Sequence, residues 1–136
     1  MALADIQPLE RNEAGIAAAI AALRGRFGDR LSTSAALRLQ HGDITTYLPS
    51  QPPDAVVFAE STEDVQHLVT ICAANRAPVI PYGTGTSLEG GVNAPAGGIC
   101  VDLSRMNRIL AVDADDMDAM VEAGVTREQL NIHLRD

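Results

Sequence analysis

Residues 55–80 read AVVFAESTEDVQHLVTICAANRAPVI, and the pattern changes twice within them. Residues 55–59 form a short apolar run, which is typical of a buried strand. A helical pattern begins at Ser61, and Pro78 stops it because proline lacks an amide hydrogen. Residues 79–80 begin a second apolar run. A strand, a helix and a strand in this order predict a βαβ unit with parallel strands.

The helix of this unit has a marked beginning and an apolar face. Ser61, followed three residues later by Asp64, forms a capping box that satisfies the first free amides of a helix. The residues expected on the buried face are Val65, Leu68, Val69, Cys72 and Ala73. We therefore expect one side of this helix to pack against the sheet.

The segment before this unit also has helical character. Ile16, Ile20, Leu23 and Phe27 recur at helical spacing, and Gly28 can end the helix that they predict. We therefore expect a first helix within an N-terminal helical lead.

A proline-rich run marks the end of this lead. A shorter apolar stretch, residues 35–39, stops near His41, and residues 49–53 read PSQPP, which cannot form regular structure. We therefore divide the chain into an N-terminal helical lead, residues 1–48, and a second region, residues 49–136.

Three more strands are predicted in the second region, over residues 98–103, 109–112 and 117–123. In the last of them, apolar residues alternate with Asp118 and Glu122, as in a half-buried strand. The residues expected on its buried side are Met117, Ala119, Val121 and Ala123. These strands follow the βαβ unit along the chain.

A final helix is predicted to begin at Thr126, which forms a capping box with Gln129. Val125 and Leu130 fit the hydrophobic staple around this start. The chain reaches Asp136 without a glycine or proline that would end the helix. We therefore expect this domain to be interrupted, so that the chain is a truncated part of a larger one.

Composition excludes several classes of protein. The chain has 136 residues with 18 acidic and 10 basic side chains, a formal charge of -8. Nucleic acids and anionic membranes need a basic surface, so neither is an expected partner. All the basic residues are arginines, and without lysine neither a Walker phosphate loop nor Schiff-base chemistry is available. Cys72 and Cys100 are expected to be reduced, buried thiols.

The location of the protein is predicted from what the sequence lacks. No apolar run is long enough to cross a membrane. The first residues, MALADIQPLERNEAG, do not combine a basic region with an apolar core, so they are not a secretory signal. The expected location is the cytoplasm, or the periphery of the inner face of a membrane.

A glycine-rich loop holds the candidate binding residues. Residues 78–93 read PVIPYGTGTSLEGGVN, in which Gly83 and Gly85 flank Thr84. Glycines let a ligand approach the backbone, and successive amides in such turns form a nest for an anion. The loop contains no basic side chain, so backbone dipoles and hydroxyl groups would hold a phosphate. A glycine-rich turn without a ligand remains the alternative at this point.

A Rossmann dinucleotide site is a weaker alternative. Leu88 stands where the fingerprint requires glycine, and more glycines and prolines follow in place of the helix that a Rossmann loop enters. Asp102, at the end of the next predicted strand, resembles the ribose-binding acid of that fold. The missing helix outweighs this likeness.

Taken together, these segments resemble a known family. The combination of PDAVV, the ST-E-V helix start, P-x-GTGTSLEGG and DLSRMNRI resembles the PCMH-type FAD-binding domain of the vanillyl-alcohol oxidase superfamily, from Gln40 to Asp136. The resemblance is strongest to FAD-linked D-lactate dehydrogenases of the cytochrome type and to glycolate oxidase flavoprotein subunits. It implies the α+β fold class, and it implies that this chain contains the first subdomain of such a domain and the opening of the second.

The resemblance also implies a cofactor and its binding residues. The cofactor is FAD, and its pyrophosphate is expected at Tyr82, Gly83, Thr84, Gly85, Thr86 and Ser87. Gly90 and Gly91 are expected to pass near the flavin.

By the same resemblance, the parent protein oxidises D-lactate or a related D-2-hydroxy acid to the 2-keto acid and passes electrons to a cytochrome or a quinone. Family members extend well beyond Asp136, where their substrate domain, catalytic histidine and arginine, and metal site lie. The chain alone is therefore expected to bind FAD weakly and to be inactive, with no catalytic or metal-binding residue of its own. The alternative is a truncated, non-catalytic FAD-binding fragment that depends on a partner chain or on self-association.

The remaining polar residues are expected to be structural. His41 is predicted to be exposed or to cap a helix, and His67 to be solvated. The aspartates of DADDMD, residues 113–118, lack the glycine and spacing of a calcium loop and predict a solvated turn. Arg105 and Arg108 are expected on the surface.

Overall fold

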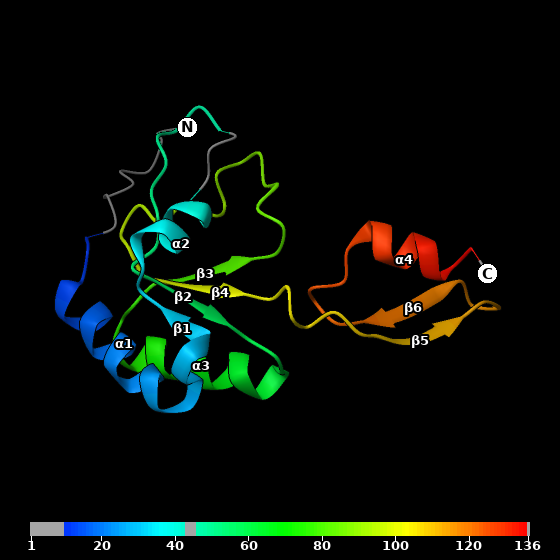
Figure 1. Ribbon diagram of the computed structural model, residues 1–136, viewed down its shortest axis with the longest axis horizontal. Coiled ribbons are helices and arrows are strands. Elements are labelled where there is room, and N and C mark those ends of the chain that lie inside the picture. The colour runs from blue at the N-terminus through cyan, green and yellow to red at the C-terminus, as the bar shows by residue number, and fades with distance from the viewer. Residues whose placement is uncertain (1–9, 43–45, 136) are drawn as a thin grey trace, which may run out of the picture.

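The computed structural model describes residues 10–42 and 46–135, which form two lobes (Figure 1). The first residues of the segment compared with a secretory signal, 1–9, lie outside this range. The first lobe contains α1 (Glu13–Phe27), η1 (Gly28–Arg30), β1 (Leu31–Ser32), α2 (Ala35–Gln40), β2 (Ala55–Phe58), α3 (Thr62–Ala74), β3 (Val79–Tyr82) and β4 (Ile99–Asp102). The second lobe contains β5 (Ile109–Asp113), β6 (Asp118–Val121) and α4 (Arg127–His133).

The sheet of the first lobe is built around β4. Its strand order is β1-β2-β4-β3, with β2 and β3 both parallel to β4 and β1 antiparallel at the edge. All four residues of β4 are buried, as expected for the central strand of a parallel sheet. The predicted βαβ unit is confirmed, but its two strands flank β4 instead of pairing with each other.

Helix α3 covers one side of this sheet through a narrower face than the sequence predicts. Leu68 and Cys72 are fully buried, and Val65 and Ile71 pack partly against the same core. Val69 and Ala73 are exposed, so their expected place on the buried face is wrong. The stripe through positions 68 and 72 faces the sheet, and positions 69 and 73 lie about 100° further round the helix.

The N-terminal lead shares the core of the sheet. Helix α1 ends where the sequence predicts, and Gly28 caps it with φ 50°. Its apolar face belongs to the same buried cluster as Leu68 and Cys72. Helix α1 packs on α3 and β1 pairs with β2, so the lead completes the first lobe. The division of the chain at residues 48 and 49 stays a prediction.

The second lobe is a β-hairpin with α4 beside it (Figure 1). Its predicted elements are confirmed, and the Thr126 hydroxyl accepts the Gln129 amide hydrogen at 3.1 Å as the capping box requires. The half-buried character predicted for residues 117–123 is wrong. All four residues of β6 are exposed, and Met117 lies in the turn with φ 56°. A two-stranded hairpin has too few neighbours to bury one face of a strand.

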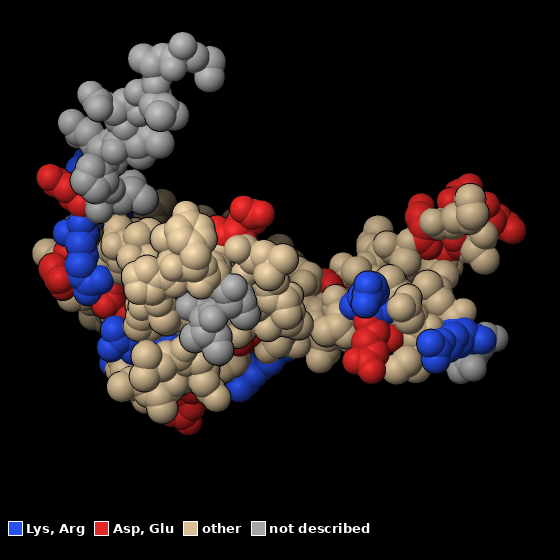
Figure 2. All heavy atoms as spheres, turned by 90° about the horizontal axis from the view of Figure 1, so that it is seen from above, with Lys and Arg blue, Asp and Glu red and all other residues tan. Residues whose placement is uncertain are grey.

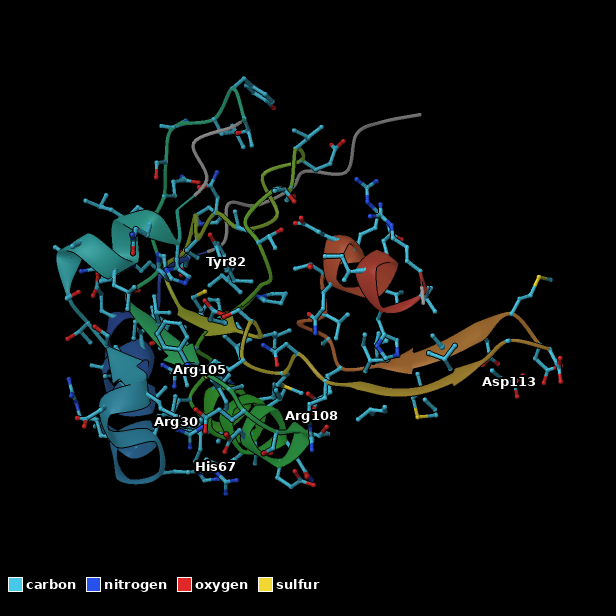
Figure 3. The ribbon with its side chains drawn as sticks, turned by 45° about the vertical axis from the view of Figure 1, so that its right-hand side comes forward. Arg30, His67, Tyr82, Arg105, Arg108 and Asp113 are labelled. Carbon is cyan, nitrogen blue, oxygen red and sulfur yellow. The ribbon has the colours of Figure 1, made fainter. Side chains whose placement is uncertain are left out.

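Acidic side chains gather at the outer end of this hairpin (Figure 2). Asp113 lies at its tip (Figure 3), where its carboxylate accepts the amide hydrogens of Asp115 and Asp116 at 3.1 and 3.0 Å. All residues of this turn are exposed, which confirms the predicted solvated turn. In the part of the chain that the structure describes, no helix has the length and apolar character needed to cross a membrane.

The start of α3 is tied to α1 by a buried carboxylate. The Ser61 hydroxyl accepts the Asp64 amide hydrogen at 3.2 Å, as predicted, but the Asp64 side chain accepts from the Glu60 amide and from two arginines. Arg26 donates to it at 3.0 Å and Arg30 at 2.5 Å. Burial acts to raise the pKa of Asp64, but the hydrogen bonds from Arg30, Glu60 and Arg26 outweigh burial and hold the pKa below its usual value.

We expect Asp64→Asn to lower the free energy of unfolding by about 2 kcal/mol at neutral pH, because it leaves two part-buried arginines without their carboxylate. A depressed carboxyl pKa stabilises the folded state above the ordinary pKa of aspartate. The difference between the two proteins should therefore shrink as the pH falls below that value. Urea unfolding at a series of pH values measures this difference, and a gap that stays constant into acid would contradict it.

Candidate functional site

The carboxyl ends of three parallel strands meet at one edge of the sheet. Phe58, Tyr82 and Asp102 are the last residues of β2, β3 and β4, and both Phe58 and Tyr82 are register partners of Asp102. Ligands of open α/β sheets bind beyond this edge. The loop of residues 83–98 leaves from it, so the sheet topology brings the glycine-rich segment to the place where a ligand is expected.

The loop is irregular along its length and presents backbone donors. Residues 83–98 contain no helix, as the sequence predicts. Within the described residues, no oxygen atom accepts the amide hydrogens of the four consecutive residues Gly83, Thr84, Gly85 and Thr86. The hydroxyl oxygens of Thr84 and Thr86 lie 3.2 Å apart. The amide and hydroxyl hydrogens of these residues are therefore available to bind an anion, because they are not bonded to carbonyl oxygens of the protein backbone.

Most of the predicted site residues come together at one hollow. A cavity of about 290 Å³ is lined by Pro81, Gly83, Thr84, Gly85, Thr86, Ser87, Gly91 and Val92. Tyr82 and Gly90 do not line it. The Tyr82 ring lies against His41, and Gly90 is so close to Leu48 that an added Cβ would be 3.3 Å from its methyl group.

Two further hollows separate the loop from the second lobe. One, of about 400 Å³, is bounded by Gly83 and Thr84 on one side and by residues 123–127 on the other. The other, of about 660 Å³, is bounded by Thr84 and Thr86 and by α4. The glycine-rich loop therefore forms one wall of a cleft whose opposite wall is the start of α4.

This cleft is lined by two cations that the sequence analysis missed, Arg127 and Arg135. Arg127 lines both hollows beside Thr84. It follows directly after the cap of α4, and a basic residue at the beginning of a helix is disfavoured by the helix dipole. That unfavourable position is the one signal in the sequence that pointed to Arg127.

The two arginines considered in the sequence have other partners. Arg105 donates to Glu60 at 2.8 Å and lies over the Phe58 ring, 4.7 Å from its centroid. Arg108 pairs with Glu122 at 2.6 Å at the base of the hairpin (Figure 3). Both arginine side chains are largely exposed, so their predicted place on the surface is confirmed.

The expected exposure of His41 is wrong, although its backbone does cap α2. Its side chain is buried at the carboxyl edge, where Nε2 lies 2.8 Å from Asp102 Oδ2. The reason is the fold of the lead, which places the end of α2 above the last residue of β4. His67 keeps part of its surface exposed and lies near Phe27, with ring centroids 6.3 Å apart, so its expected solvation is not contradicted.

Both cysteines are free and buried, as predicted. Burial raises the pKa of Cys72 to about 11. Burial and then the nearby charge of Asp102 raise the pKa of Cys100 to about 12. A thiol must lose its proton to act as a nucleophile, so neither cysteine is suited to that chemistry at neutral pH.

Gly85 has a backbone that only glycine adopts easily. Its φ is 71°, and an added Cβ would lie 2.4 Å from the Tyr82 hydroxyl oxygen. We expect Gly85→Ala to lower the free energy of unfolding by about 1–2 kcal/mol because of backbone strain and this contact. Urea unfolding measures the change.

Gly25→Ala is the matched control, because Gly25 lies inside α1 with no atom within 4 Å of an added Cβ. This control should be more stable than the original chain by about 0.5–1 kcal/mol. Equal stability of the Gly85→Ala protein and the original chain would contradict the strain at Gly85.

The fold matches that of enzymes of known structure. The chain superimposes on 4-ethylphenol oxidase from Gulosibacter chungangensis with a TM-score of 0.82 and 27% identity, over 95% of this chain and 26% of that one. For p-cresol methylhydroxylase the TM-score is 0.77 at 25% identity, over 92% of this chain and 25% of that one. The architecture is therefore the first part of a PCMH-type FAD-binding fold.

The family follows from the sequence match. Residues 53–136 match the FAD binding domain family, which is more than half of the chain. The chain belongs to this family, and its cofactor is FAD.

Several relatives have known names. The chain is 44% identical over 124 residues to a probable mitochondrial D-lactate dehydrogenase of Danio rerio. It is 37% identical over 119 residues to the mitochondrial D-lactate dehydrogenase (cytochrome) of Arabidopsis thaliana. It is 38% identical over 73 residues to the glycolate oxidase subunit GlcD of Bacillus subtilis.

These alignments cover 90%, 86% and 54% of this chain. They cover only 25%, 21% and 16% of the three relatives, so the chain spans a quarter of their length or less. The resemblance seen in the sequence is confirmed.

Proposed function

We propose that this chain binds the pyrophosphate of FAD at the loop Tyr82–Ser87, with Gly90 and Gly91 near the flavin. The observation that carries this proposal is the run of four amides, from Gly83 to Thr86, whose hydrogens have no acceptor among the described residues. These amides belong to residues that line the hollow beside the loop. A pyrophosphate fits such a site because it needs several donors at close range and no bulky side chain between them.

A positive charge across the cleft supports a bound anion in the same place, although the loop itself supplies none. The loop has no basic residue, and the whole chain has a formal charge of -8. Arg127, on the opposite wall of the cleft, supplies a positive charge near Thr84. In this proposal the amides hold the phosphate oxygens and Arg127 offsets part of their charge.

The proposed reaction of the parent protein is the oxidation of D-lactate or a related D-2-hydroxy acid to the 2-keto acid. Bound FAD supplies the hydride acceptor for such a reaction. The names of the relatives support this substrate class, because they include D-lactate dehydrogenases and a glycolate oxidase subunit. The role of this chain is to bind and orient the cofactor.

The alternative proposal is a non-catalytic FAD-binding fragment that depends on a partner chain or on self-association. One observation favours it. None of the histidines of the chain, all of which are among the described residues, lines the hollows around the loop. The identity of the electron acceptor, a cytochrome or a quinone, and a location in the cytoplasm or at the inner face of a membrane stay predictions.

We expect FAD to bind at least about tenfold more tightly than NAD, because the loop lacks the Rossmann helix that a nicotinamide dinucleotide uses.

Gly83→Ala is the variant that tests the role of the loop backbone most directly. An added Cβ at Gly83 would meet no protein atom within 4 Å, so stability should stay within about 0.5 kcal/mol of the original. The methyl group would obstruct the backbone, and FAD affinity should fall about tenfold.

Isothermal titration calorimetry measures the affinity for FAD and the affinity for NAD, and Gly25→Ala serves as the control for adding a methyl group far from the loop. Equal affinity for FAD and NAD would contradict the proposal. So would a Gly83→Ala protein that binds FAD as tightly as the original chain.

A separate measurement tests whether this chain has any oxidising activity of its own. We expect the 136-residue chain, loaded with FAD, to leave the flavin oxidised when D-lactate is added without oxygen. The reason is that no histidine lines the cleft, so none is placed there to accept the hydroxyl proton of the substrate. The absorption band of oxidised flavin measures this, with L-lactate as the control. Bleaching by D-lactate alone would show that this chain itself carries out the oxidation.

A further inference from the structure

A histidine and an aspartate lie buried directly beneath the glycine-rich loop. His41 follows α2 and Asp102 ends β4, 61 positions apart in the sequence. His41 Nε2 and Asp102 Oδ2 are 2.8 Å apart, and the side chains are only 7% and 6% exposed. Polar groups as buried as these are costly unless each is fully bonded. The burial of the His41 and Asp102 side chains therefore needs a structural explanation.

The hydrogen bonds of His41 fix the orientation of its ring. Nδ1 lies 2.9 Å from the Leu37 carbonyl oxygen, which only accepts, so Nδ1 carries a hydrogen. Nε2 is left to share one hydrogen with Asp102. The second carboxylate oxygen of Asp102 accepts the Ser104 amide hydrogen at 2.8 Å. Each polar atom of the pair thus has a partner, and the imidazole plane is held from both sides.

The fixed ring supports the first residue of the loop. The Tyr82 ring packs on the His41 ring with centroids 4.3 Å apart, and its hydroxyl lies 3.4 Å from the Gln40 carbonyl oxygen. The Phe58 ring meets His41 edge-on from β2, with centroids 6.1 Å apart. Burial and then the charge of Asp102 raise the pKa of Tyr82 above its usual value, so its hydroxyl stays neutral. Tyr82 lies where β3 gives way to the loop (Figure 3).

Tyr82 in turn occupies the space beneath Gly85. A Cβ at Gly85 would lie 2.4 Å from the Tyr82 hydroxyl oxygen and 2.8 Å from the ring carbon that bears it. Gly85 is in the left-handed region, with φ 71°, and is one of the four residues with available amides. A continuous series of contacts therefore runs from Asp102 through His41 and Tyr82 to the turn of the loop.

We propose that His41 and Asp102 are positioning residues for the cofactor. The two residues act through Tyr82 to hold the turn at Gly85 in the conformation that binds phosphate. This inference rests on the proposed binding of FAD at the loop. A loop that is already ordered loses less entropy when its ligand binds, so the buried pair increases affinity without contacting the cofactor.

His41→Ala tests this role by removing the ring under Tyr82. We expect FAD affinity to fall about tenfold, the size of effect that loss of loop preorganisation gives. In nitrogen-15 spectra without FAD, the amide signals of Gly83 and Gly85 should shift or broaden, and that of Gly25 in α1 should not. His67→Ala is the matched control, since it removes a half-buried histidine of α3 that touches Phe27 instead of Tyr82.

Asp102→Asn and Asp102→Ala separate positioning from simple destabilisation. The asparagine amide can donate to Nε2 while Nδ1 still donates to Leu37, so Asp102→Asn should keep affinity within about twofold of the original chain. Asp102→Ala removes this partner and should weaken binding as His41→Ala does. Equal losses in both Asp102 variants would overturn positioning through the ring.

The spectra keep this inference distinct from the proposed function. If the original chain does not bind FAD, the proposed function fails, and the response of the loop amides to His41→Ala still tests the series of contacts. If the original chain binds FAD but His41→Ala alters neither the loop amides nor the affinity, the positioning role is wrong. Circular dichroism identifies any variant that fails to fold. If His41→Ala does not fold, Tyr82→Leu tests the contact between Tyr82 and the turn, and it should change the amide signal of Gly85 more than that of Gly25.

Discussion

The pairing of β4 between β2 and β3 is the constraint on which the rest of this structure depends. Because all three strands are parallel, their last residues meet at one edge, and the loop that follows β3 starts there. The buried strand Ile99–Asp102 also sets the depth of Asp102 below that loop. The sheet thus fixes, in one arrangement, the position of the glycine-rich segment and of the polar pair beneath it.

The proposed binding of phosphate by the backbone of the loop explains the residues around it. A phosphate held by amides needs little help from side chains, so a chain without lysine and with a formal charge of -8 can still form such a site. The requirement shifts to the conformation of the backbone. Gly85 must hold a positive φ, and in the inference drawn above its support comes from Tyr82 and His41.

The second lobe contributes differently. Its hairpin buries little of itself, with Leu110, Val112 and Met120 all exposed. In the proposed site its contribution is α4, which places Arg127 and Thr84 on opposite walls of the same cleft. Residues from two lobes, more than 40 positions apart in the sequence, therefore face the same space. This arrangement fits a fold in which the FAD-binding residues are shared among separate segments.

The sequence by itself determined the local elements and the loop. Proline, glycine and the caps at Ser61 and Thr126 act on their near neighbours, so the order of helices and strands and the irregular glycine-rich segment were predictable from it. The tertiary structure decided which residues became neighbours: β4 between β2 and β3, His41 against Asp102, and Arg127 across the cleft. It also decided that Val69 and β6 are exposed. Such outcomes depend on contacts between distant segments, which only the packing of the sheet, α1 and α4 defines.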